Sequence, residues 1–190
     1  MLLTILKIFT RLISIILTPK FTNKPKNLRL KFPFKVSNSN RIYIGSNVYI
    51  GSNSTLNPLT KGEHGESYDP KIKIGNNVSA TANLQIHCVE KIEIEDDVLI
   101  AANVFIVDCS HGYETVSSPF KNQPLTHIGS VKIGKGSWIG QNVVILQGVE
   151  IGIMSIIGAN SVINKSIPPF CIAVGNPAKV IKKWNEYNNT

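Results

Sequence analysis

Isoleucine recurs at every sixth position through the second half of this chain. The unbroken series is Ile133, Ile139, Ile145, Ile151, Ile157 and Ile163, and the same spacing occurs upstream at Ile44, Ile50 and Leu56, at Ile74, Ala80 and Ile86, and at Ile94, Ile100 and Ile106. A helix repeats every 3.6 residues and a strand every two, so neither element alone produces this period. A solenoid does, because each coil places the same apolar position above the one before it.

Each group of six residues predicts a short strand and a corner, and three groups predict one triangular coil of about eighteen residues. Glycine follows most of the isoleucines, as at Gly134, Gly140 and Gly152, and we expect it to supply positive φ angles at the corners. Residues 40–170 therefore predict an all-β parallel β-helix of about five triangular coils. An ordinary parallel α/β sheet is not supported, because no helical segment of ten or more residues separates the strands.

Two stretches break the period, residues 57–73 and residues 112–132, and both are rich in Pro, Gly, Ser, Lys and Asn. We expect both to leave the prism as protruding loops. Loops on a rigid scaffold often carry binding and catalytic residues, so the second break marks the place to look for a site.

The first twenty residues, MLLTILKIFTRLISIILTPK, are mostly apolar, and a stripe of polar residues at intervals of three and four runs through them at Thr4, Lys7, Arg11, Ser14 and Thr18. This spacing predicts an amphipathic helix over residues 1–22. Lys7 and Arg11 argue against a helix that spans a membrane. Two interpretations remain, a cap on the open end of the prism and a helix of residues 1–20 lying in the plane of a membrane. We expect a cytoplasmic protein, with association with the inner membrane as an option.

The net charge of +8 and the pI near 9.4 favour an anionic partner. A nucleic-acid partner is not expected, because the lysines are scattered and no zinc-finger, RRM or helix-turn-helix pattern occurs. No metal site is expected either. The three cysteines have no CxxC spacing, and no two of the four histidines are close enough to suggest a zinc site, which leaves His64, His87 and His127 without a metal role.

Asp108 and His111 stand at the corner where the second loop begins. A histidine within reach of an acceptor can remove its proton while a thioester is attacked. Asp108 could orient the ring or bind an acceptor hydroxyl. The other interpretation is that both residues only form hydrogen bonds within the corner. Glu150, one coil further along, is a more remote candidate for contact with His111.

A family resemblance favours the catalytic interpretation. Residues 76–111 include NNVSATANLQIHC and EDDVLIAANVFIVDCSH, and they resemble the galactoside and maltose O-acetyltransferase branch of the hexapeptide-repeat acyltransferases without a gap. The resemblance implies left-handed coiling of the β-helix. It also implies that His111 is the catalytic base and that Asn83 contacts the acceptor sugar.

The run from Ile133 to Ile181 resembles the coenzyme A half of the same enzymes, above all in its ending VGNPAKVI. The resemblance implies that the cofactor groove is lined by Trp138, Gln141, Ala159, Asn164 and Lys165. Lys179 and Lys182, in a C-terminal coenzyme A-contacting segment of residues 171–190, carry charges suited to phosphate groups. Family members are trimers with sites between neighbouring prisms, so a homotrimer is implied.

The sequence thus predicts an acetyl-CoA-dependent O-acetyltransferase that acts on a hydroxyl of a sugar or glycan precursor and requires no metal. Acetylation of a sugar amine, or of serine, is the nearest alternative, because the VGNPAK ending also occurs in serine acetyltransferases and nucleotide-sugar N-acetyltransferases. A non-enzymatic β-helix that serves as a binding or structural module is a third interpretation. The residues do not identify the sugar.

Overall fold

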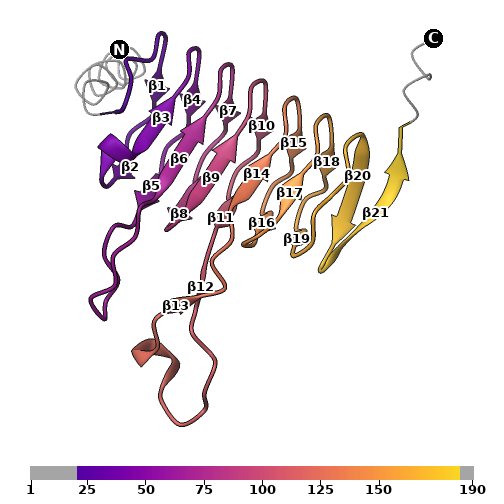
Figure 1. The fold of residues 1–190 in the computed structure, drawn as a ribbon. Coiled ribbons are helices and arrows are strands. Elements are labelled where there is room, and N and C mark those ends of the chain that lie inside the picture. Colours follow the sequence, from indigo (N-terminus) through magenta and orange to yellow (C-terminus); the bar gives the residue numbers. More distant parts are fainter. Residues whose placement is uncertain (1–20, 185–190) are drawn as a thin grey trace, which may run out of the picture.

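A computed structural model of the chain describes residues 21–184. The described chain winds into a prism whose strands fall into three sheets, as Figure 1 shows. The predicted amphipathic helix over residues 1–22 lies almost wholly outside the described residues, so it remains a prediction. Within residues 21–184 there is no helix long and apolar enough to cross a membrane.

The three sheets are named A, B and C here. Sheet A contains β1 (Arg29–Leu30), β4 (Tyr49–Ile50), β7 (Ser79–Ala80), β10 (Leu99–Ile100), β15 (Trp138–Ile139), β18 (Ile156–Ile157), β20 (Cys171–Gly175) and β21 (Ala178–Lys183). Sheet B contains β2 (Phe34–Val36), β5 (Ser54–Pro58), β8 (Gln85–Cys88), β11 (Phe105–Val107), β16 (Val144–Ile145) and β19 (Val162–Ile163). Sheet C contains β3 (Ile42–Ile44), β6 (Lys71–Ile74), β9 (Lys91–Ile94), β14 (Val131–Ile133) and β17 (Glu150–Ile151).

Neighbouring strands within each sheet are parallel, except that β21 returns antiparallel to β20. The all-β parallel β-helix is thereby confirmed. The coil is eighteen residues long in the C-terminal half, where Trp138 pairs with Ile156. It is twenty residues long further upstream, where Ser79 pairs with Leu99. The coils extend beyond the predicted range, since sheet A already begins at Arg29 and its last parallel strand ends at Gly175.

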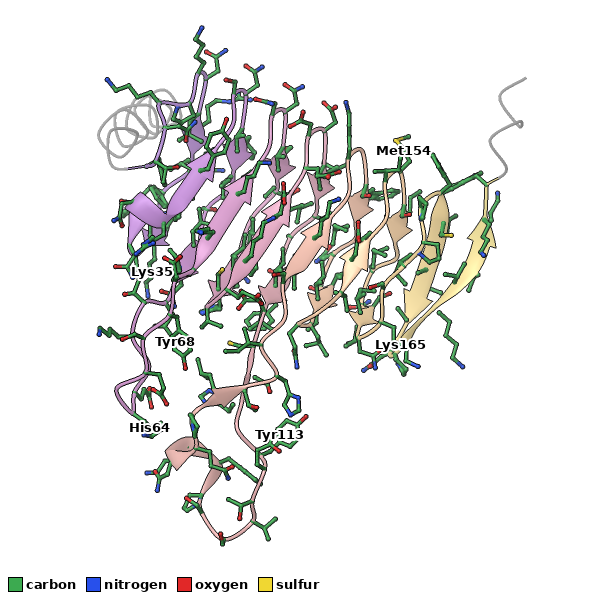
Figure 2. The ribbon with its side chains drawn as sticks, in the orientation of Figure 1. Lys35, His64, Tyr68, Tyr113, Met154 and Lys165 are labelled. Carbon is green, nitrogen blue, oxygen red and sulfur yellow. The ribbon has the colours of Figure 1, made fainter. Side chains whose placement is uncertain are left out.

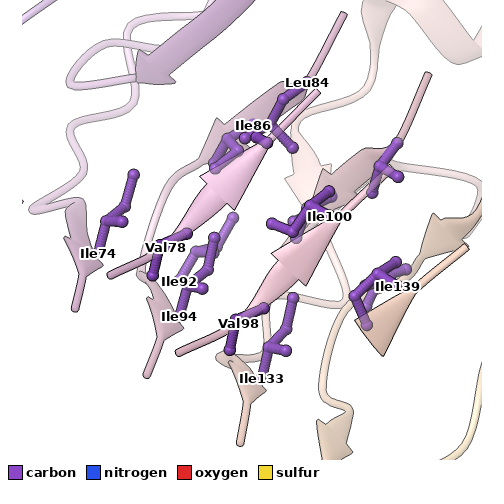
Figure 3. Close-up of a cluster of buried hydrophobic side chains, with 14 of the residues drawn as sticks. Ile74, Val78, Leu84, Ile86, Ile92, Ile94, Val98, Ile100, Ile133 and Ile139 are labelled. Carbon is purple, nitrogen blue, oxygen red and sulfur yellow. The ribbon is translucent and has the colours of Figure 1, made fainter. Parts of the chain in front are cut away.

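The interior of the prism is filled by the isoleucines of the repeat. In sheet C, Ile74 pairs with Ile94 and Ile94 pairs with Ile133, and all three side chains are fully buried. Figure 3 shows these columns of stacked aliphatic side chains. Burial of each such side chain contributes about 1.5–3 kcal/mol, so the six-residue period is an energetic requirement of the fold.

The corners differ from the prediction in how they use glycine. Gly134, Gly140 and Gly152 do not adopt positive φ. They are required for space, because a Cβ atom at Gly140 would lie 2.7 Å from the backbone of the next coil. The positive φ angles belong mainly to residues three positions after the buried aliphatic residue, such as Asn77 and Asn103. Asparagine adopts this left-handed conformation more readily than most residues other than glycine.

These corner residues form ladders of hydrogen bonds along the prism. Between sheets A and B the ladder runs from Asn83 through Asn103 and Asn142 to Asn160, with nitrogen to oxygen distances of 2.9–3.0 Å. Each rung satisfies an amide group of the coil beside it, so the ladder fixes the stacking register.

The outer face of sheet C carries charged pairs. Glu93 accepts from Lys73 at 2.7 Å and forms an ion pair with Lys91 at 2.8 Å. The hydrogen bonds from these two ammonium groups lower the pKa of Glu93 to about 2.

Glu93→Gln should therefore remove a stabilisation that depends on pH. A carboxyl group whose pKa falls on folding stabilises the protein above its ordinary pKa of 4.5 and loses that effect as the pH falls towards 2. We expect the variant to be less stable than the wild type by roughly 1 kcal/mol at neutral pH, with the gap closing in acid. Urea unfolding at several pH values measures the difference in the free energy of unfolding between the variant and the wild type. A difference that does not change with pH would contradict the lowered pKa of Glu93.

Two loops leave the prism from the corner between sheets B and C. The first connects β5 to β6, and the second connects β11 to β14 and contains the antiparallel pair β12 (Ser110–His111) and β13 (Leu125–Thr126). Figure 1 shows both projecting from the same edge. Short 3₁₀ helices lie at Ser39–Arg41 and Phe120–Asn122. The two predicted loops thus share one edge of the molecule, but both are shorter than predicted. Residues 57–58 belong to β5 and residues 71–73 to β6, while residues 131–132 belong to β14.

Candidate active site

A cavity of about 620 Å³ lies between the two loops and the outer face of sheet B. Leu59, His64 and Glu66 line it from the first loop, and His111 and Leu125 line it from the second. The loops also touch each other, because the His64 ring Nε2 lies 3.1 Å from the backbone oxygen of Lys121. The loops are labelled in Figure 2 by His64 and Tyr113.

The register of sheet B defines the floor of the cavity. Asn57 pairs with His87, and His87 pairs with Val107. The pairing of β11 with β16 places Leu146 on the next rung. All four residues line the cavity, together with Phe105. The floor is therefore polar towards the N-terminal coils and apolar towards the C-terminal coils.

His111 lies in β12 at the wall of the cavity and is exposed. The hairpin that carries it is closed by β-pairing between His111 and Leu125 and by the bond from Gly112 N to Pro124 O at 2.9 Å. The hydroxyl of Ser110, beside it, is buried and has no hydrogen-bond partner among residues 21–184. The imidazole thus stands on an anchored hairpin and faces a space that could hold an acceptor.

Asp108 is fully buried and does not line the cavity. Its carboxylate accepts hydrogen bonds from the backbone N–H groups of Val89 at 2.8 Å and Glu90 at 2.9 Å, and from the Cys88 thiol at 3.2 Å. This arrangement agrees with the interpretation in which Asp108 only forms hydrogen bonds within the corner. The extended corner of the twenty-residue coil is closed by this one side chain.

The two cysteine thiols of the cavity wall are not activated. Burial raises the pKa of the Cys88 thiol, and burial followed by the charge of Asp108 raises the pKa of Cys109 to about 11. A thiol with a raised pKa is a poor nucleophile at neutral pH. An acyl-cysteine intermediate is therefore not supported by this site.

Five of the predicted acceptor and cofactor residues divide between two corners of the chain. Asn83, Gln141 and Ala159 lie at the corner between sheets A and B, where Asn83 belongs to the asparagine ladder. Asn164 and Lys165 directly follow β19, which places them at the corner between sheets B and C, in register with Leu146 and Gln147 of the cavity. Within one chain, sheet B separates Asn83 from His111.

Trp138 lies on the outer face of sheet A and is 48% exposed. It pairs with Leu99, which is 47% exposed, and with Ile156. Lys179 and Lys182 are exposed on β21, in register with Val174 and Ile172 of β20. The backbone N–H of Gly175, where β20 ends, donates to Ser161 Oγ at 3.0 Å, which fixes the β20–β21 hairpin to the last coils.

The other residues considered, Glu150 and His127, do not line the cavity. Glu150 forms an ion pair with Lys132 at 3.3 Å on the outer face of sheet C and is not brought to the cavity. His127 stacks on Tyr113 and pairs with Glu114 at 3.2 Å within the second loop. Across the described part of the chain, no cluster of three metal-ligating side chains occurs.

Sequence reasoning missed the cavity floor. Asn57, His87 and Phe105 occupy outward-facing positions of sheet B, and their proximity follows only from the register of β5, β8 and β11. The sequence held one signal for this floor: Asn57 and His87 are polar residues at outward-facing strand positions beside the corner from which the loops depart.

The coiled fold and the repeat define the class of this protein: it belongs to the bacterial hexapeptide-repeat transferase family. Residues 130–165 match the family description "Bacterial transferase hexapeptide (six repeats)". The chain is 33% identical over 184 residues to WbbJ of Escherichia coli (strain K12), a candidate lipopolysaccharide biosynthesis O-acetyl transferase, covering 93% of this chain and 89% of the relative. It is 39% identical to the galactoside O-acetyltransferase of the same organism over 63% of this chain and 58% of that enzyme.

Two solved structures share the fold. A variant of AntD, an N-acyltransferase from Bacillus cereus in complex with dTDP and coenzyme A, superposes with a TM-score of 0.75 at 23% identity, covering 91% of this chain and 89% of that chain. A hexapeptide-repeat acetyltransferase from Vibrio cholerae O1 biovar eltor in complex with acetyl coenzyme A superposes with a TM-score of 0.60 at 21% identity, covering 96% and 89%. The protein is an acyltransferase of this family.

Proposed function

We propose that this protein is an acetyl-CoA-dependent O-acetyltransferase that acetylates a hydroxyl of a sugar or glycan precursor, with His111 as general base. The observation that carries the proposal is His111 on an anchored hairpin at the wall of a 620 Å³ cavity. The O-acetyl transferase names of the two relatives described above favour an oxygen acceptor.

The proposed reaction is a direct transfer in a ternary complex. His111 takes the proton of the acceptor hydroxyl as the oxygen attacks the thioester carbonyl carbon. The tetrahedral oxyanion then collapses, the carbon–sulfur bond breaks, and the proton on His111 passes to the departing thiolate. The products are the acetyl ester and coenzyme A. Each proton is returned, so the enzyme leaves the cycle unchanged.

The experiment that tests this function is the release of thiol from acetyl-CoA across a panel of sugars, nucleotide sugars, amino sugars and serine. Faster thiol release with a hydroxyl acceptor, and an acetyl ester among the products, would support it. A preference for the amino sugars would instead support N-acylation, for which the fold shared with AntD is the motivating observation. If coenzyme A does not stabilise the protein against heat, the chain is a binding or structural module.

We infer that the coenzyme A site is shared between neighbouring chains of a homotrimer. Asn83, Gln141 and Ala159 lie at a different corner from His111, so one chain does not bring them together. The exposed apolar pair Leu99 and Trp138 on sheet A suits contact with another protein surface. In this arrangement Asn164, Lys165, Lys179 and Lys182 supply polar and positive groups for the cofactor and its phosphates.

The full chain should therefore have the mass of three 20.9 kDa subunits in light scattering. Trp138→Glu should weaken assembly, because it places a charge against an apolar surface. We expect the dissociated variant to lose transferase activity while keeping its β-sheet circular dichroism spectrum. A monomeric wild type that is fully active would contradict the shared site.

The proposed location is the cytoplasm, where acetyl-CoA is made. The apolar stripe of residues 1–20 is proposed to rest on the inner membrane surface. Unchanged membrane partitioning of a chain that lacks residues 1–20 would remove this part of the proposal.

A further inference from the structure

The floor of the cavity contains a chain of hydrogen bonds that no step of the proposed reaction uses. The hydroxyl of Ser37 donates to Asn57 Oδ1, and Asn57 Nδ2 faces Nδ1 of His87 at 3.4 Å. Ser37 directly follows β2, so these three residues occupy successive rungs on the outer face of sheet B. The chain of bonds runs towards the cavity and ends on the imidazole of His87.

The hydrogen bond with Asn57 determines which ring nitrogen of His87 carries the proton. Burial lowers the pKa of His87, so the ring is neutral at physiological pH. The amide nitrogen of Asn57 is a donor, so the Nδ1 atom that faces it is the acceptor, and the single ring proton resides on Nε2. Among residues 21–184, Nε2 has no hydrogen-bond partner. The site thus presents one uncharged donor to the cavity.

Phe105 lies beside this donor. Its ring centroid is 5.6 Å from that of His87, and the two rings are tilted by 35°. Both rings line the cavity. A partly exposed aromatic ring next to an uncharged donor suits the two surfaces of a sugar ring, an apolar C–H face and a polar edge of hydroxyl groups.

The charges around the cavity balance. Lys61 and Lys121 line it together with Glu63 and Glu66, so the formal charges of the lining cancel. A diphosphate or a carboxylated sugar would meet no net positive field here. The lining favours an acceptor without charge.

We propose that His87, oriented by Asn57, and the ring of Phe105 form an acceptor subsite that binds a neutral pyranoside. The inference rests on the proposed sugar acetyltransferase activity and assigns its acceptor class. His87 is a specificity-determining residue that donates from Nε2 to a sugar oxygen. Asn57 is a positioning residue that acts through His87.

The test uses the full chain with methyl β-galactoside and methyl β-maltoside as neutral probes and glucose 6-phosphate as the anionic probe. His87→Leu should raise the KM for the neutral glycosides about tenfold, with little change in kcat or in the KM for acetyl-CoA. His87→Gln retains a donor near the position of Nε2 and should stay within about threefold of the wild type. Phe105→Leu should raise the same KM about fivefold. His127→Gln, outside the cavity, is the matched control and should change nothing.

The positioning role of Asn57 has its own readout. A carboxylate in Asn57→Asp accepts hydrogen from Nδ1, which moves the proton of the neutral ring away from Nε2 and favours the doubly protonated ring in acid. The ratio of variant to wild-type kcat/KM for the neutral glycosides should therefore rise as the pH is lowered. A ratio that does not change with pH would remove Asn57 from the subsite.

Ligand-observed NMR separates failure of the subsite from failure of the proposed activity. If the wild type shows saturation transfer to the methyl glycosides and His87→Leu abolishes it, the subsite is supported even if no acetyl transfer occurs. Acetylation of the glycosides with an unchanged KM in His87→Leu would overturn the subsite and leave the activity standing. Absence of both binding and turnover for the neutral glycosides, or a higher kcat/KM for glucose 6-phosphate, would also overturn it.

Discussion

Replacement of His111 by alanine should lower kcat by about 10²- to 10⁴-fold, the range that a general base contributes. The expected reason is that no other group takes the acceptor proton at the start of the transfer. The binding of coenzyme A should be retained, because the predicted cofactor residues lie on other coils. Initial rates of thiol release at saturating acetyl-CoA measure the loss, and thermal shift with coenzyme A measures the binding.

His127→Ala is the matched control for this experiment. It removes an exposed histidine from the same loop, and this residue pairs with Glu114 rather than lining the cavity. Its turnover should stay within about twofold of the wild type, as expected for a surface substitution. Equal losses in the two variants would indicate damage to the loop and would contradict catalysis by His111.

Replacement of Asp108 by alanine should have the largest effect on stability, a loss of about 3–5 kcal/mol in the free energy of unfolding. The substitution leaves the N–H groups of Val89, which is buried, and of Glu90, which is exposed, without their acceptor. For a chain of this size, that loss corresponds to a fall in Tm of about 6–20 °C. Differential scanning calorimetry of the full chain at fixed concentration is the measurement.

Asp97→Asn is the control for Asp108. Asp97 occupies an exposed corner, where its Oδ1 accepts from Asn77 Nδ2 at 2.9 Å, and an asparagine can accept the same bond. The expected change is below about 0.5 kcal/mol. If Asp108→Ala were no less stable than this control, the buried carboxylate would not close the extended corner.

The sequence predicted the prism correctly because one physical requirement repeats in it. A side chain at every sixth position must fill the interior, so Ile133, Ile139 and Ile145 show the period directly. The strands, the stacking order and the two protruding loops follow from that period. The class of enzyme was accessible as well, since the resemblance covered the coils that follow Asn76.

The finer features depend on contacts between distant residues. The twenty-residue coils require an extended corner that Asp108 closes from the next coil, and single residues do not reveal that bond. The cavity floor depends on the register that brings Asn57 beside His87. The separation of Asn83 from His111 depends on which corner each occupies. These three features arise only when the coils stack, so the residues of one coil do not predict them.

Both loops depart from one edge of a scaffold whose interior is formed by other residues. The aliphatic columns fix the strands, and residues 59–70 of the first loop and residues 112–130 of the second contribute little to those columns. Asp108, at the start of the second loop, is not part of either segment, because it closes a corner of the prism. Length and composition can therefore change in these two segments without disturbing the repeat. In this architecture, acceptor choice and folding stability can be altered independently, so new acceptors can arise by exchange of two loops on an unchanged prism.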